Sequence, residues 1–131
     1  MAPIAMSCAE EGGGSEATGS HPAGNVRDLP VSAVTPLSGV ALVIARDAAG
    51  VYAMSTLCTH AQCDMNGTDG SISNAELVCS CHGSRFDPNG VPTRGPAGRP
   101  LPHYAVTIST EGDIVIMAGS AVGANVRVAV L

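Results

Sequence analysis

The chain has 131 residues, which is one domain by ordinary length, and 45% of them are hydrophobic, which is enough for a packed core. Its formal net charge is −5, it has no lysine and it shows no basic patch, so we do not expect nucleic acid as a partner. No run of about 18 apolar residues occurs, so we expect no transmembrane helix.

The types of hydrophobic residue indicate the fold class. The chain has one Phe, two Tyr and no Trp, so its core must consist of Val, Ile, Leu and Ala. Sixteen Gly and nine Pro imply many turns. Short β-branched runs between such turn residues predict an all-β domain.

The first 24 residues differ in composition from the rest. They mix Glu, Gly, Ser and Pro and cannot bury enough apolar surface to offset the entropy of ordering. We expect residues 1–24 to form a flexible tether and residues 25–131 to form the folded domain. His21, within the tether, is expected to have no role.

The strand-like runs that follow pair into hairpins. Residues 40–45 and 51–57 flank a turn at residues 47–50 and predict one hairpin, and residues 104–108 and 113–117 flank a turn at residues 111–112 and predict a second. Residues 126–131 predict a last strand, and His103 is expected at the surface. Between the hairpins, residues 58–99 are rich in turns, so we expect an all-β base with an inserted loop region.

This loop region contains four of the five cysteines and two of the four histidines. They fall in two boxes, Cys58-Thr59-His60-Ala61-Gln62-Cys63 and Cys79-Ser80-Cys81-His82-Gly83-Ser84-Arg85-Phe86-Asp87. Such clustering indicates a metal site or a disulfide framework. Thiolates and imidazoles together suit zinc, copper or an iron–sulfur cluster better than magnesium or calcium. The residues alone leave a zinc site and a two-iron cluster both open.

The two boxes resemble the two loops of Rieske iron–sulfur proteins, C-T-H-x-G-C and C-x-C-H-G-S. Gly95-Pro96-Ala97 resembles the proline-containing loop that covers the cluster in that family, and the resemblance extends over roughly residues 25–117. It implies an antiparallel β-sandwich base with an inserted, loop-rich cluster-binding subdomain at about residues 57–98. Gln62 stands where the family often has Gly, so we expect the local backbone to differ slightly.

The resemblance also implies roles for individual residues. Cys58 and Cys79 would bind one iron of a single [2Fe–2S] cluster and His60 and His82 the other; the alternative for these four residues is a zinc site. Cys63 and Cys81 would form a disulfide between the two loops, with two free buried thiols as the alternative.

Three further features concern the surroundings of the implied cluster. Ser84 matches the family position whose hydroxyl donates to a bridging sulfide, and Gly95 and Pro96 belong to the covering loop. Phe86 falls where high-potential members carry a Tyr that donates to a cysteine sulfur. Without that hydroxyl, we expect a lower reduction potential than theirs.

The resulting functional hypothesis is an extracytoplasmic one-electron carrier with no catalysis of its own and no small-molecule substrate. A disulfide implies an oxidising compartment. The expected partner is a redox protein, either a cytochrome or an oxidoreductase subunit. Arg85, Arg94 and Arg99 are either solvated charges or residues that guide this partner. Cys8 follows Ala5-Met6-Ser7, a weak lipobox match, and is either a free thiol or a lipid attachment site, the one membrane contact we expect.

Three alternatives to a stand-alone carrier remain. The first is the Rieske small subunit of a larger oxidoreductase, such as an arsenite-oxidase-like or quinol-oxidising complex. The second is a ferredoxin that feeds an aromatic-ring oxygenase, and it is less favoured because those ferredoxins usually lack the pair Cys63 and Cys81. The third is a structural zinc module, which would be colourless when purified.

Overall fold

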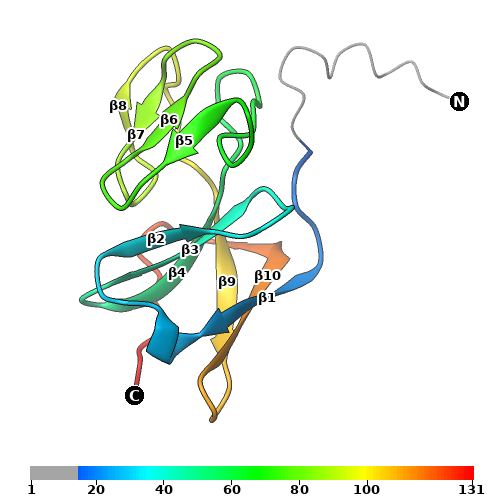
Figure 1. Ribbon diagram of the computed structural model, residues 1–131, viewed down its shortest axis with the longest axis vertical. Coiled ribbons are helices and arrows are strands. Elements are labelled where there is room, and N and C mark those ends of the chain that lie inside the picture. Colours follow the sequence, from blue (N-terminus) through cyan, green and yellow to red (C-terminus); the bar gives the residue numbers. More distant parts are fainter. Residues whose placement is uncertain (1–14) are drawn as a thin grey trace, which may run out of the picture.

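A computed structural model describes residues 15–131 as two antiparallel β-sheets, one above the other (Figure 1). The larger sheet has the strand order β1-β10-β9-β4-β3-β2 and forms the base. Its strands are β1 (Ser20–Asn25), β2 (Ala33–Pro36), β3 (Leu42–Asp47), β4 (Gly50–Ser55), β9 (His103–Ile108) and β10 (Asp113–Val122). The all-β fold class is confirmed: among the described residues the one helix is a single 3-10 turn, η1 (Val26–Asp28).

The smaller sheet is inserted between β4 and β9 and forms the upper part of Figure 1. Its strands follow chain order: β5 (Gly70–Ile72), β6 (Leu77–Cys79), β7 (Arg85–Phe86) and β8 (Pro92–Arg94). We call residues 56–102 the cluster subdomain, because the two cysteine boxes lie within it. The expected inserted loop region is therefore present, with four short strands of its own.

Strands β3 and β4 connect two hydrophobic cores, because successive side chains of a strand point to opposite faces. Leu42, Ile44 and Val51 pack in the base core against β9 and β10. Val43 and Met54 face the other way and pack in the core of the cluster subdomain. Buried on both faces, these strands read as continuous apolar runs, and they support the loops that follow β4.

Both expected hairpins are confirmed, β3–β4 around Asp47 and Gly50 and β9–β10 around the turn before Asp113. The last strand expected at residues 126–131 is wrong, since only Val128 makes a bridge there, to Val51. Strand β9 already pairs with β4 at Ala53 and Met54, so the carboxyl-terminal segment pairs with β4 only at Val51.

The boundary expected for the tether is also wrong over the residues that the structure describes. Strand β1 begins at Ser20, five residues before the expected boundary, and pairs with β10, and the side chain of Ala17 is buried. Pairing at a sheet edge needs backbone groups rather than apolar side chains, so composition did not reveal this strand. The part of the expected tether at residues 1–14, which includes Cys8, lies outside the described residues. In residues 15–131, no helix has the length and apolarity needed to cross a membrane.

Candidate metal centre between two cysteine–histidine loops

The first cysteine box forms a tight loop at the end of β4. The backbone N–H of Cys58 donates to the carbonyl of Cys63 at 2.9 Å, and the N–H of Gln62 donates back to the carbonyl of Cys58 at 2.7 Å. Below the loop, Thr56 Oγ1 donates to Asp64 Oδ1 at 2.6 Å. The chain ends that enter and leave the box are thereby held together.

The second box closes in the same way between β6 and β7. The N–H of Cys79 donates to the carbonyl of Ser84 at 2.8 Å, and the N–H of Gly83 donates to the carbonyl of Cys79 at 3.0 Å. In both loops the N–H four residues after the first cysteine returns to that cysteine's carbonyl. The two boxes thus share nearly the same backbone conformation, and in each a histidine follows the first cysteine by two or three residues.

This shared frame explains the unusual residue in the first box. Gln62 has φ +61° and Gly83, at the equivalent position, has φ +83°. The left-handed region is unfavourable for a residue with a Cβ and is open to glycine. Gln62 therefore has a backbone conformation in the left-handed region that favours glycine.

The loops bury the two cysteines and expose the two histidines. Cys58 is 1% exposed and Cys79 is fully buried, whereas His60 and His82 lie at the surface. The two imidazole rings meet edge to face with centroids 4.8 Å apart. Burial raises the pKa of the Cys79 thiol, the backbone N–H groups of Cys81 and His82 oppose this, and the neighbouring Cys58 sulfur adds to it.

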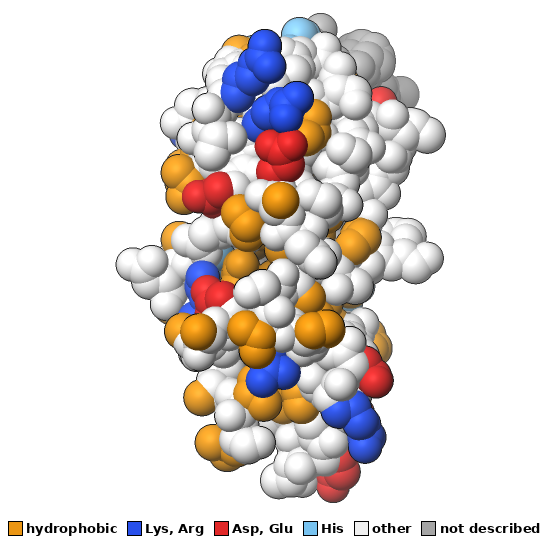
Figure 2. Space-filling model, turned by 60° about the vertical axis from the view of Figure 1, so that its left-hand side comes forward, with side chains coloured by type: hydrophobic (Ala, Val, Ile, Leu, Met, Phe, Trp, Pro, Cys, Tyr) orange, Lys and Arg blue, Asp and Glu red, His pale blue; other side chains and the backbone are white. Residues whose placement is uncertain are grey.

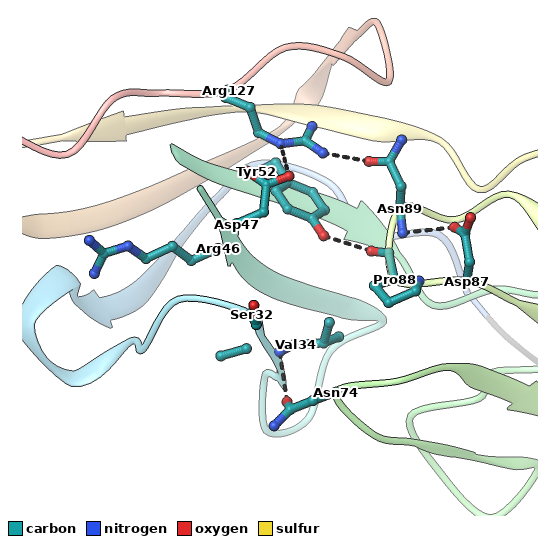
Figure 3. A pocket seen from close by; sticks show the side chains of 11 residues that line it. Ser32, Val34, Arg46, Asp47, Tyr52, Asn74, Asp87, Pro88, Asn89 and Arg127 are labelled. Carbon is teal, nitrogen blue, oxygen red and sulfur yellow. Dashed lines mark hydrogen bonds and ion pairs between the residues drawn. The ribbon is translucent and has the colours of Figure 1, made fainter. Parts of the chain in front are cut away.

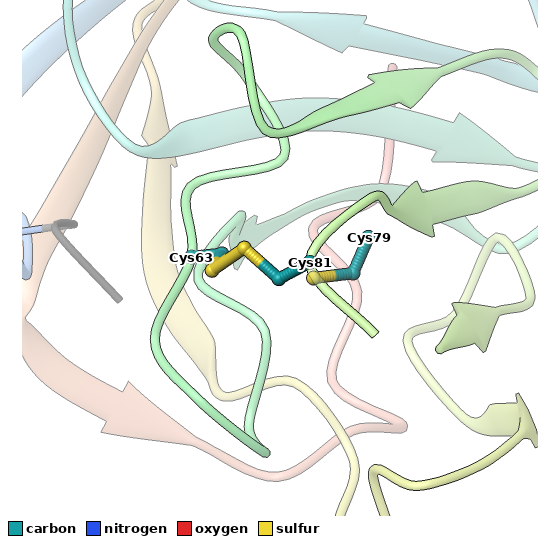
Figure 4. Close-up of side chains that lie close together, drawn as sticks. All are labelled: Cys63, Cys79 and Cys81. Carbon is teal, nitrogen blue, oxygen red and sulfur yellow. A yellow bond between two sulfur atoms is a disulfide. The ribbon is translucent and has the colours of Figure 1, made fainter. Parts of the chain in front are cut away.

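The Cys63–Cys81 disulfide is confirmed and joins the two loops, with the Cα atoms 6.6 Å apart. The sulfurs of Cys63, Cys79 and Cys81 lie within 4.8 Å of one another, and Figure 4 shows Cys79 beside the bridge. The two bridged sulfurs have no thiolate to offer a metal. Within the described residues, the free thiols are therefore those of Cys58 and Cys79.

A third loop, at residues 94–100, is fastened to both boxes. The N–H of Ala97 donates to Ser84 Oγ at 2.9 Å, and Thr59 Oγ1 donates to the carbonyl of Arg99 at 2.7 Å. Gly95 and Pro96, joined by a cis peptide bond, are exposed on this loop. The buried Ser84 hydroxyl accepts one bond here, which leaves its own proton available to a sulfur acceptor.

The donor set fits the group that the sequence resemblance implies. Two buried sulfurs and two exposed imidazole rings are the ligands that a Rieske [2Fe–2S] cluster requires. Backbone N–H groups of Cys81 and His82 act on the Cys79 sulfur, and such donors stabilise a thiolate. Phe86, fully buried on β7, packs in the same core and offers no polar atom.

Below the metal centre, a cleft of about 340 Å³ separates the cluster subdomain from the base sheet (Figure 3). Tyr52 Oη donates to the carbonyl of Pro88 at 2.7 Å, and the Arg127 guanidinium lies 3.7 Å from the centre of the Tyr52 ring. Arg127 also donates to Asp47 at 2.9 Å and to Asn89 at 2.7 Å. These contacts tie the carboxyl-terminal segment and β4 to the turn after β7.

His103 belongs to the same network, and its expected place at the surface is wrong. It is 2% exposed, its ring stacks on Tyr52 with centroids 5.7 Å apart, and Nε2 lies 2.9 Å from the carbonyl of Asn89. As the first residue of β9, it faces the core of the subdomain. Sequence reasoning missed the supporting residues Tyr52, Thr59, His103 and Arg127. A lone arginine among the valines of residues 126–130 was the one available signal.

Comparisons with known proteins agree with this geometry. The model of the family described as "Rieske [2Fe-2S] domain" matches residues 20–105. The cytochrome b6-f complex iron-sulfur subunit of Synechococcus sp. strain WH7803 is 35% identical over 102 residues, which is 76% of this chain and 52% of that protein. The cytochrome bc1 complex Rieske iron-sulfur subunit of Corynebacterium diphtheriae is 38% identical over 66 residues, 49% of this chain and 16% of that protein. The chain thus spans about half or less of the length of such relatives.

Two solved structures have a similar fold. The cyanobacterial plasma membrane Rieske protein of Synechocystis PCC 6803 aligns with a TM-score of 0.56 and 24% identity, covering 73% of this chain and 97% of that one. The ferredoxin of carbazole 1,9a-dioxygenase from Nocardioides aromaticivorans IC177 aligns with a TM-score of 0.51 and 28% identity, covering 76% and 97%.

Proposed function

This chain belongs to the Rieske [2Fe–2S] family, and we propose that it is an extracytoplasmic one-electron carrier whose cluster is held by Cys58 and Cys79 on one iron and by His60 and His82 on the other. The observation that carries this proposal is the pairing of two buried thiols with two exposed imidazoles on disulfide-linked loops. The bound cluster supplies reversible one-electron chemistry, and two neutral imidazoles in place of thiolates raise its potential.

The residues of the chain have separate tasks in this function. The buried side of the site keeps water from the two sulfurs, while His60 and His82 form the surface nearest to a partner. The disulfide and the hydrogen bond from Ala97 to Ser84 hold the three loops in fixed positions relative to one another. Ser84 would donate its free proton to the cluster, and Gly95 and Pro96 would cover it. Phe86 would pack without donating, which places the potential below that of members with both donors.

A test of the ligand set replaces His82 by Ser. One iron would lose half of its protein ligands, so we expect loss of bound iron and of the Rieske electron paramagnetic resonance signal. His21→Ser is the matched control, because His21 lies on β1, in the base. Retention of both irons with an unchanged signal in the His82 variant would refute the assignment, and zinc in place of iron in the purified wild type would favour the structural alternative.

The cellular location is testable through the cysteines. A disulfide between Cys63 and Cys81 favours an oxidising compartment outside the cytoplasm. In cells whose thiols are blocked at the moment of lysis, mass spectrometry should find this bridge intact; two alkylated cysteines there would contradict the extracytoplasmic proposal. The same spectra decide whether Cys8 carries a lipid, with Cys8→Ser as the control.

A second candidate is a subunit of a larger oxidoreductase. Relatives of this chain are subunits of cytochrome b6-f and bc1 complexes, and that observation favours it. Purification of the tagged chain from native membranes under mild conditions distinguishes the two. A stand-alone carrier elutes at its own mass, whereas a subunit elutes with stoichiometric companions.

A further inference from the structure

The exposed end of the cluster subdomain carries charge of one sign. We call this end the tip surface, and it consists of the loops at residues 58–63, 79–84 and 94–100. These three loops contain no Asp and no Glu. Their charged side chains are Arg94 and Arg99, both exposed, in a chain whose net charge is −5. The net charge of the tip surface is therefore positive, whereas that of the whole molecule is negative.

Hydrogen bonds hold the third loop, which carries both arginines, against the two loops that carry the histidines. The carbonyl of Arg99 accepts from Thr59 Oγ1 at 2.7 Å, so Arg99 adjoins the loop that carries His60. Arg94 begins the same third loop, which Ala97 fastens to the loop that carries His82. In residues 15–131, neither guanidinium takes part in a hydrogen bond or ion pair. Figure 2 shows arginine side chains below a histidine at this end, one of them in contact with acidic side chains.

The carboxylates nearest to the tip surface are engaged elsewhere. Asp64 accepts from Thr56 and from the N–H of Asn66. Glu76 pairs with Arg85 at 2.9 Å, and Arg85 is the cross-strand neighbour of Arg94.

Two further carboxylates complete the surroundings. Asp87 accepts from the N–H groups of Asn89 and Val91, and Asp69 is a half-buried carboxylate beside the second box, where its carbonyl accepts from Ser80. None of these four carboxylates belongs to the three loops, so the formal charge of the tip surface itself is +2, from Arg94 and Arg99.

Resting on the function proposed above, we propose that the tip surface docks the acidic face of an electron-transfer protein, with Arg94 and Arg99 steering the approach. An oxidised Rieske centre with two thiolates is formally neutral and the reduced centre has one negative charge, which the two arginines outweigh, so the arginines set the sign of the local field in both states. Charges beyond about 10 Å are largely screened at ordinary ionic strength, so a partner at the tip senses these arginines more than the acidic base. Such local fields change association rates more than final affinity.

Charged inorganic oxidants test the proposal on the loaded protein. One electron passes from the reduced cluster to ferricyanide, an anion, to give ferrocyanide, or to tris(phenanthroline)cobalt(III), a cation, to give the cobalt(II) complex. By stopped flow, we expect the ferricyanide rate to fall about tenfold from low to high salt, and the cobalt rate to stay level or rise. Arg99→Gln should remove much of the ferricyanide effect, and Arg94→Gln/Arg99→Gln most of it.

Arg27→Gln is the matched control, because it makes the same change in net charge at an exposed site on η1, in the base. It should leave the salt dependence of both rates unchanged. If the ferricyanide rate rises with salt, as the net charge alone would dictate, or if Arg27→Gln acts as strongly as Arg99→Gln, the proposal is overturned.

A second readout needs no electron transfer. At low salt and neutral pH, a sulfonate cation exchanger should retain the wild-type chain despite its negative net charge. Arg94→Gln/Arg99→Gln should pass unretained, while Arg27→Gln should elute with the wild type. Equal retention of all three proteins would contradict a positive tip surface. A preparation without the cluster signal would count against the proposed function, and the column result would still decide the docking proposal.

Discussion

The base sheet and the cluster subdomain are stabilised in different ways. The base has strands of up to ten residues with an aliphatic core shared by β3, β4, β9 and β10. The strands of the cluster subdomain have two or three residues, and part of its core is supplied by Val43 and Met54 of the base. So few residues in regular sheet bury too little to be stable alone. A disulfide and side-chain hydrogen bonds to the backbone replace the missing strand pairing.

The largest effect is expected for Cys63→Ser, which removes the disulfide between the two loops. We expect a loss of about 2–5 kcal/mol, confined to the cluster subdomain. Hydrogen exchange read by mass spectrometry should show faster exchange in peptides containing Cys79 and Gly83, with β3 unchanged. Cys81→Ser and the double variant should match the single one, because all three remove the same bond. Equal loosening of both regions would disprove the contrast.

Acid should weaken the contacts that join the two regions across the cleft. Burial lowers the pKa of His103 below its ordinary 6.5, and the Arg127 charge adds to this, against the bond to Asn89. The unfolded chain then binds the proton more readily, so the free energy of unfolding falls as pH drops below the unfolded value, by at most about 1.4 kcal/mol per pH unit. Denaturation at several pH values should show a smaller slope in His103→Gln than in His21→Gln. Identical slopes would show that His103 does not contribute.

A single hydroxyl should act differently in the two regions. Phe86→Tyr, in the cluster subdomain, should raise the midpoint potential by some tens of millivolts if the new hydroxyl donates to the Cys58 sulfur, since about 59 mV is tenfold in equilibrium constant for one electron. Tyr104→Phe removes a hydroxyl from the base core and should leave the midpoint unchanged in voltammetry. An unchanged midpoint in Phe86→Tyr, with the hydrogen bond visible in a crystal structure, would count against the role given to Phe86.

The smallest effects should come from the equivalent positions of the two ligand loops. Gly83→Ala places a side chain at φ +83° with open space around its Cβ, so backbone strain alone should cost about 1–2 kcal/mol. Gln62→Gly relieves the same strain but adds freedom to the unfolded chain, so we expect a net gain below about 1 kcal/mol. Thermal unfolding measures both. If Gln62→Gly destabilises as much as Gly83→Ala, the two loops do not share one backbone frame.

Local patterns predicted the parts of the fold that depend on local signals. The strand-like runs and the turn residues around residues 47–50 and 111–112 located both central hairpins, because hairpin pairing is encoded by neighbouring residues. The boxes located the loops of the candidate metal centre, because its proposed ligands come from two short segments. Strand β1 and the failed strand at residues 126–131 were mispredicted, because edge pairing depends on which distant strand is free.

By itself, the sequence determined the all-β class, the family and the two loops with their cysteines and histidines, since each of these is written in contiguous residues. Only the tertiary structure decided that His103 is buried against Tyr52, that Arg127 reaches Asn89, and that Arg99 lies beside the first ligand loop. These contacts join residues that are far apart in the chain, and their geometry follows from how the two sheets pack. A sequence shows which groups are present, whereas the three-dimensional packing sets which charges remain exposed beside the metal centre.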